Sequence, residues 1–186
     1  MALNGNYLLA KKFEISGKFN LMEEYMLKAA NEGYVVAMVE LAKYYLKKED
    51  ERATKLLIMG IVSGNVESMI LLGNKYRLIR FYKEAEKYFL KAINKKNLTA
   101  MNLLAIMYEA KGDLENASNL YFEAVLEGDS FAAHNLGGLH FKNKEFSLSE
   151  IYYEMSKKRG VEKEPNTSER IFSGEYSLST FLNKSL

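Results

Sequence analysis

The sequence predicts an all-α protein, an α-solenoid of about five antiparallel helix hairpins that repeat every 31 to 32 residues. Three observations lead to this prediction. The only proline is Pro165, so the chain before it can be helical without interruption. Apolar and small residues recur at the repeat period with the spacing of amphipathic helices. Signals that end one helix stand directly before signals that begin the next.

The boundaries between hairpins recur with the same period. A glycine, which can take the left-handed conformation that ends a helix, stands at four of these boundaries, and at three of the boundaries an Asn or Asp that can cap the following helix comes next. We therefore expect a tight turn at each boundary. The glycines are Gly33, Gly64, Gly128 and Gly160, with Lys96 at the remaining place, and the capping residues are Asn65, Asn97 and Asp129.

Each repeat is expected to hold two amphipathic helices. The first carries a leucine, a small residue directly after it, and a ring four residues beyond the leucine. The second alternates small and large residues, which lets neighbouring helices nest. In chain order, first helices are expected around residues 9–13, 41–45, 72–76, 104–108 and 136–140, and second helices around 22–29, 53–60, 85–92, 117–124 and 149–156.

The leucine–small–x–x–aromatic pattern, followed by alanine, aromatic and alanine, resembles the tetratricopeptide repeat. Residues 28–45, KAANEGYVVAMVELAKYY, are more specifically similar to the Sel-one-like subfamily, as are LKAINKKNLTAMNLLAIMY and FEAVLEGDSFAAHNLGGLHF. The resemblance spans about residues 4–160 and implies a right-handed solenoid that binds proteins. Two features depart from the family pattern: methionines replace the usual early tryptophan, and the period is shorter than is usual in either family. The methionines are Met38, Met69 and Met101.

The chain is expected to have two parts, a repeat domain of residues 1–160 and a C-terminal segment of residues 161–186. Val161–Arg170 is polar and holds the proline, which indicates a linker. Leu178, Phe181 and Leu182 then form a short apolar stripe at helical spacing. We expect this stripe to belong to a capping helix on the last repeat. The alternative is a tail that docks in a groove of its own or of a neighbouring molecule.

Composition indicates an ordinary soluble protein, with 48% apolar and 27% charged residues. A formal charge of +2 is too small to indicate a nucleic-acid surface. The absence of cysteine excludes disulfides, thiolate zinc sites and thiol nucleophiles. The first residues lack a signal-peptide pattern, and no run approaches the roughly 20 apolar residues of a membrane span. We therefore expect a cytoplasmic protein that does not bind membranes.

The sequence offers no catalytic or metal-binding pattern. His134 and His140 lie about 240° apart around one expected helix, so they cannot share a metal ion from it. The glycine pairs lack the strand-to-helix setting of a phosphate-binding loop. Basic clusters at residues 94–97 and 156–159 fall at the ends of second helices, where cations oppose the helix dipole. We expect a protein that is not an enzyme and carries no cofactor or metal.

The expected function is non-catalytic binding of a protein or peptide segment, as a scaffold or adaptor. In arrays that this sequence resembles, first helices line the concave surface, so residues opposite each leucine are expected to form a groove. Amide and cationic groups such as Asn74 and Arg77 could hold a peptide backbone or carboxylate. The predicted groove residues are Tyr7, Lys11, Val39, Lys43, Leu46, Ile70, Asn74, Arg77, Asn102, Ile106, Glu109, His134 and Phe141. The alternatives are a partner-blocking inhibitor or immunity protein and, ranked lower, an RNA-binding module or an enzyme.

Overall fold

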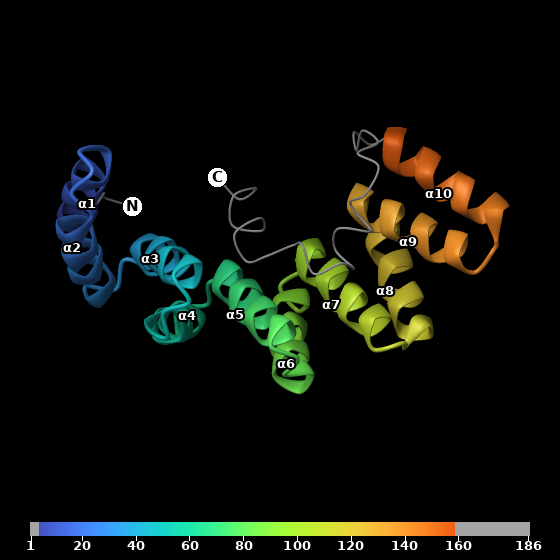
Figure 1. Cartoon of the computed structure of the whole chain (residues 1–186), viewed down its shortest axis with the longest axis horizontal. Helices are drawn as coiled ribbons and strands as arrows, with labels where there is room; N and C mark the ends of the chain where they lie inside the picture. Colours follow the sequence, from blue (N-terminus) through green and yellow to red (C-terminus); the bar gives the residue numbers. More distant parts are fainter. Residues whose placement is uncertain (1–3, 159–186) are drawn as a thin grey trace. The chain divides into compact units, whose positions relative to one another are not determined.

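A computed structural model describes residues 4–158 of the chain, and this range forms ten α-helices and no strand (Figure 1). The all-α prediction is therefore confirmed. Gly160 and the expected capping stripe of Leu178, Phe181 and Leu182 lie outside the described residues. The helices are α1 (Gly5–Ile15), α2 (Phe19–Asn31), α3 (Val35–Lys47), α4 (Arg52–Val62), α5 (Val66–Leu78), α6 (Tyr82–Ile93), α7 (Leu98–Ala110), α8 (Leu114–Leu126), α9 (Ser130–Lys142) and α10 (Phe146–Lys158).

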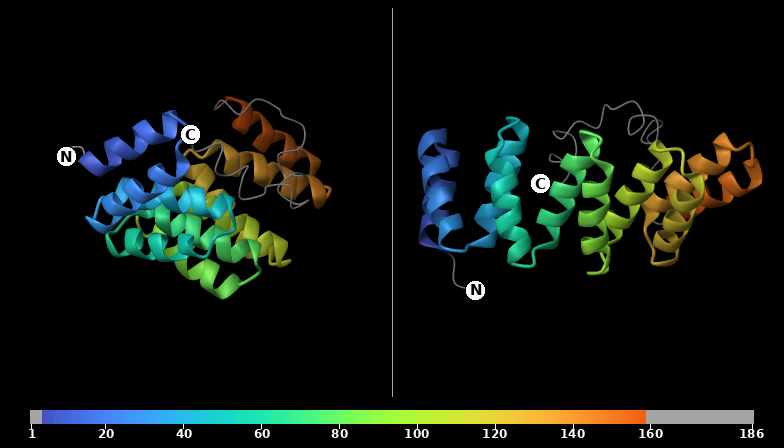
Figure 2. Two further views of the ribbon diagram at one scale, coloured as in Figure 1. Left: turned by 60° about the vertical axis from the view of Figure 1, so that its left-hand side comes forward. Right: turned by 90° about the horizontal axis from the view of Figure 1, so that it is seen from below.

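The described residues divide into two compact units, residues 4–72 and 73–158, with the division inside α5. In the first unit α1 packs against α2, α2 against α3, and α3 against α4. In the second unit α6 packs against α7, α7 against α8, α8 against α9, and α9 against α10. Because the linking turns are short, consecutive helices run antiparallel (Figure 2). Each unit is thus built from helix hairpins that stack on their neighbours.

The turns between hairpins have the expected chemistry. Gly33, Gly64 and Gly128 all have positive φ, at 86°, 77° and 98°. Lys96, at the place without a glycine, adopts the same left-handed conformation with φ of 59°. The register of the turn therefore persists even where an L side chain raises its cost.

The capping residues after these turns are also confirmed. The side chain of Asn97 accepts a hydrogen bond from the backbone N–H of Ala100 at 2.9 Å, and Asp129 accepts one from Ala132 at 2.9 Å. Asn65 accepts from the N–H of Ser68 at 2.7 Å. Each bond satisfies one of the free N–H groups at the start of a first helix.

The leucine register forms the core. Leu41, Leu72, Leu104 and Leu136 are buried, whereas Leu9 on α1 is 42% exposed. The small residue after each leucine is needed where a ring approaches. A Cβ on Gly73 would lie 2.9 Å from two ring carbons of the fully buried Phe89. The nesting of rings against small residues is therefore confirmed within the second unit.

Candidate functional site

The second unit holds an arginine that has no carboxylate partner among the described residues. Arg77, near the end of α5, is half-buried, and its Nε donates to the Oδ1 of Asn74 at 2.9 Å. Asn74 itself is only 2% exposed. Among residues 4–158, no carboxylate forms an ion pair with Arg77, and its electrostatic neighbours are the phenols of Tyr82 and Tyr121. Burial lowers the pKa of this guanidinium. Asn74 thus orients a partly desolvated cation whose charge is uncompensated within the described chain.

The neighbouring carboxylate on this face is already engaged. Glu109 on α7 is buried and accepts hydrogen bonds from the hydroxyl of Tyr121 at 3.0 Å and from Nζ of Lys142 at 3.2 Å. Burial, and then the charge of Glu109, raise the pKa of Tyr121 well above its ordinary value. Tyr121 is therefore a neutral donor at physiological pH. Glu109 acts as a structural acceptor between α7, α8 and α9.

The remaining predicted positions of the second unit differ in exposure. Asn102 on α7 accepts a hydrogen bond from Nδ2 of Asn135 on α9 at 2.9 Å. His134 is half-buried and its ring lies 5.1 Å from that of Tyr153, and burial lowers its pKa. Phe141 is 58% exposed. The side chains on this face are therefore amide, neutral aromatic and cationic groups together with the engaged Glu109.

In the first unit the predicted polar residues pair with carboxylates that were not among the predicted groove residues. The hydroxyl of Tyr7 donates to Glu40 at 2.8 Å, and Nζ of Lys11 donates to the same carboxylate at 3.2 Å. Lys43 forms an ion pair with Glu67 at 2.6 Å. These cations already have carboxylate partners, so the first unit presents no counterpart of Arg77.

Four apolar members of the predicted groove are buried by the chain itself. They were predicted to line the groove, but packing within the chain removes them from solvent. They are Val39, Leu46, Ile70 and Ile106, with exposures of 3% to 6%. Among the predicted apolar residues, Phe141 is the one that stays exposed.

Three of the polar contacts share a spacing that the placement of residues around single helices did not take into account. In each, a residue on one first helix pairs with a residue 33 positions later on the next first helix. The residues that sequence reasoning missed are the partners Glu40, Asn135 and Lys142. The pairs are Tyr7 with Glu40, Asn102 with Asn135, and Glu109 with Lys142. A search for complementary polar residues one repeat plus one residue apart would have found them.

The described range offers neither a metal site nor a membrane-spanning helix. No group of three or more His, Cys, Asp or Glu side chains there is placed to hold a metal ion. No helix of residues 4–158 is long and apolar enough to span a bilayer.

Solved structures share this arrangement of helices. The chain is similar to the crystal structure of MamA, with a TM-score of 0.65 and 18% identity over 86% of this chain and 96% of that chain. It is similar to c5321, a protective antigen present in uropathogenic Escherichia coli strains displaying an SLR fold, with a TM-score of 0.64, 16% identity, and coverage of 97% and 41%. It also resembles a Sel1 repeat protein from Oxalobacter formigenes, with a TM-score of 0.62, 17% identity, and coverage of 91% and 83%.

No protein-family model matches this chain, and no curated protein matches it. At the identities above, the structural likeness shows the fold. The chain is a helical repeat protein with the fold of the tetratricopeptide-like and Sel1-like repeat proteins. Repeats of this kind generally mediate protein–protein interactions.

Proposed function

We propose that this protein is a non-catalytic scaffold or adaptor that binds a partner protein through the first helices of residues 73–158. The anchor of this interaction is Arg77, which binds a carboxylate on an acidic segment of the partner. The observation that carries the proposal is the half-buried guanidinium of Arg77, which has no carboxylate partner in residues 4–158.

The geometry of Arg77 suits a carboxylate. The bond from Nε to Asn74 orients the guanidinium and leaves Nη1 and Nη2, the two donors that can bind a carboxylate as a pair. Because Asn74 is buried and holds the arginine in place, little rotamer freedom is lost on binding. A partner carboxylate would also neutralise a charge that the fold has partly removed from water.

The same face favours a protein segment over a nucleic acid. Of the cations Arg77 and Lys142, Lys142 is already paired with the carboxylate of Glu109, whereas a phosphate backbone is bound by several cations along its length. The amides of Asn102 and Asn135 supply groups that can pair with a peptide backbone. An extended acidic peptide therefore matches the charges and donors of this face.

The proposal is tested by selecting a displayed library of random peptides on the immobilised full-length chain. We expect the selected peptides to be enriched in Asp and Glu. A selected peptide, synthesised with a fluorophore, should then bind the Arg77→Gln variant about tenfold or more weakly, the size of one charge-assisted contact.

The matched control is Arg80→Gln, because Arg80 is an exposed arginine three residues further along the chain. It should retain the affinity of the original chain. Equal losses in the two variants would reduce the effect to net charge, and full affinity in Arg77→Gln would refute the anchor. The Arg77→Gln variant should also melt at the original temperature or higher, because it loses a desolvated cation that has no counter-ion in the described chain.

A further inference from the structure

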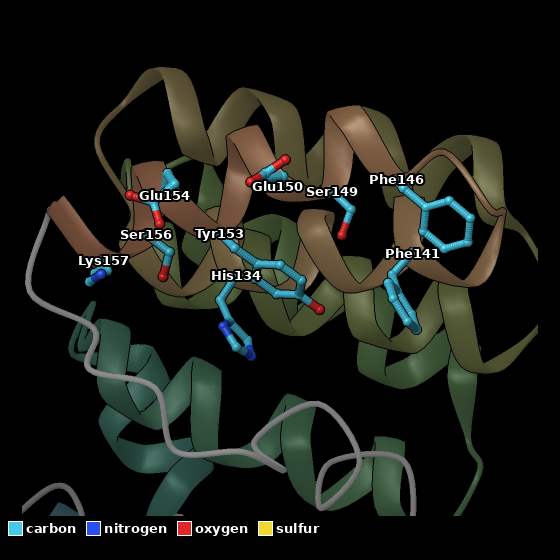
Figure 3. A pocket seen from close by; sticks show the side chains of 9 residues that line it. All are labelled: His134, Phe141, Phe146, Ser149, Glu150, Tyr153, Glu154, Ser156 and Lys157. Carbon is cyan, nitrogen blue, oxygen red and sulfur yellow. The ribbon is translucent and has the colours of Figure 1, made fainter.

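The last hairpin of the described chain has an open cavity. It measures about 300 Å³ and lies on α9 and α10 (Figure 3). Its lining comprises His134, Phe141, Phe146, Ser149, Glu150, Tyr153, Glu154, Ser156 and Lys157. Tyr153 occupies the repeat position of Phe89 on α6 and Tyr121 on α8, which are 0% and 1% exposed. Tyr153 is only half-buried. The cavity is therefore the place where a further first helix would pack.

Within each unit, a recurring hydrogen bond marks this kind of contact. The hydroxyl of Tyr45 on α3 donates to Glu23 on α2 at 2.8 Å, and that of Tyr108 on α7 donates to Glu86 on α6 at 2.6 Å. In both cases the tyrosine follows the glutamate by 22 residues. Glu150 on α10 has the same repeat position as Glu86, two repeats later. It lines the cavity, is exposed, and has no hydrogen-bond partner among residues 4–158.

A second contact marks the closest approach of a first helix to the preceding second helix. A Cβ on Gly60 of α4 would lie 3.0 Å from the Cβ of Ser68 on α5. The equivalents of Gly60 on α6 and α8 are Ala92 and Ala124, which are fully buried. On α10 the equivalent is Ser156, whose buried hydroxyl is without a hydrogen-bond partner in the described range. Glu150 and Ser156 are thus the two residues of α10 that a further first helix would contact.

In the sequence after α10, the leucine–small–x–x–aromatic pattern of a first helix occurs four residues later than the 32-residue period predicts, with Phe172 in place of the leucine. At the 32-residue period, Glu164 would take the position of Ser68 and Ser168 that of the buried leucine, which places polar groups in the core. A shift of four residues instead places Ser168 at the position of Ser68. It also places Phe172 at the leucine position and Tyr176 at the ring position. Ser173 then supplies the small residue, so the leucine–small–x–x–aromatic signature is complete.

We propose that residues 168–176 of the same chain dock in this cavity as a further first helix. In this arrangement the hydroxyl of Tyr176 donates to Glu150, and Ser168 packs against Ser156. Asn166 followed by Glu169 has the spacing of a capping box and provides the helix start. The four additional residues lengthen the connection after α10. The surface is thus occupied by the chain itself; His134 and Phe141 belong both to its lining and to the predicted groove, whereas Arg77 does not line it.

The absence of cysteine from the chain allows a direct test by crosslinking. The variant Ser156→Cys/Ser168→Cys of the full-length chain is oxidised with a mild thiol oxidant and followed by intact mass and non-reducing gels. The close approach of Gly60 and Ser68 predicts that two cysteines here reach the roughly 3.8 Å Cβ separation of a disulfide. We expect rapid formation of an intramolecular bond.

The matched control is Ser156→Cys/Glu164→Cys, which tests the unshifted register. A tail without a docked position would close this shorter loop faster, because the entropy of closure rises with loop length. A docked tail reverses the order, and we expect the Ser168 pair to react about tenfold faster. Equal rates, or a faster Glu164 pair, overturn the proposal.

Two further measurements test which molecule fills the cavity and whether Tyr176 donates to Glu150. Disulfide-linked dimers as the main product would assign the cavity to a second copy and overturn docking within the chain. Glu150→Ala in the Ser156→Cys/Ser168→Cys background removes the acceptor for Tyr176, so the rate should fall several-fold. An unchanged rate would overturn the assignment of Tyr176 to Glu150.

Discussion

Gly73 provides a sharp test of how the helices nest. It follows Leu72 on α5, and a Cβ at this position would lie 2.9 Å from two ring carbons of Phe89 and 3.3 Å from the carbonyl oxygen of Ala85. Phe89 is 0% exposed, so its ring cannot move toward solvent. Gly73→Ala therefore forces α5 and α6 apart or displaces a core ring.

Two opposing effects determine the size of the change. Overpacking of a close-packed core costs about 1–3 kcal/mol. Replacing glycine by alanine inside a helix gains about 1 kcal/mol. We expect Gly73→Ala to lower the free energy of unfolding by about 1 kcal/mol, the difference between these effects.

Two matched variants isolate the effect of the ring. Gly137→Ala places a Cβ 3.0 Å from the ring of Tyr153, which residues 4–158 leave only half-buried. Its net change should be close to zero where this ring is free to move, and similar to that of Gly73→Ala where residues 168–176 cover the ring as proposed above. Gly5→Ala, with nothing within 4 Å, should leave the protein unchanged or slightly more stable. Urea unfolding followed by circular dichroism measures all three. If Gly73→Ala is as stable as Gly5→Ala, the nesting of small residues against rings does not determine the spacing of these helices.

The remaining predictions concern the turns and the pH dependence of stability. Lys96→Gly should raise the free energy of unfolding by about 1 kcal/mol, because it removes the cost of a left-handed lysine, and Gly128→Val should lower it by about 1–2 kcal/mol for the opposite reason. Thermal melting of both variants decides, and a destabilised Lys96→Gly would contradict the reasoning. Burial and the hydrogen bond to Glu86 raise the pKa of Tyr108 from 10.0 to about 12. The folded state thus holds this proton more tightly, so the stabilisation is complete below about pH 10 and is lost as pH rises toward 12. Tyr108→Phe should flatten the fall in stability across that window, and an unchanged slope would contradict the assignment.

The local features of the fold could be predicted because their causes lie in neighbouring residues. The conformation of Gly128 and the cap at Asp129 depend on a few adjacent backbone groups. The amphipathic period depends only on residues three and four apart. Even the left-handed Lys96 was placed by the repeat register.

The candidate site could be predicted only in part. The helical wheel placed Arg77 and Asn74 on one face, where the structure joins them by a hydrogen bond. It placed Ile106 on the same side, where the structure buries it. The reason is that an inner helix such as α7 contacts neighbours on several sides, and a wheel describes only one axis.

The sequence by itself determined the helices, their boundaries and the repeat, because each follows from short-range geometry and hydrophobic spacing. Only the tertiary structure decided which charges are compensated. Lys43 forms an ion pair with Glu67, and Glu109 accepts a hydrogen bond from Tyr121. Arg77 forms no ion pair with a carboxylate in the described chain. These pairings depend on the distances between side chains on different helices, which packing determines and local periodicity does not encode.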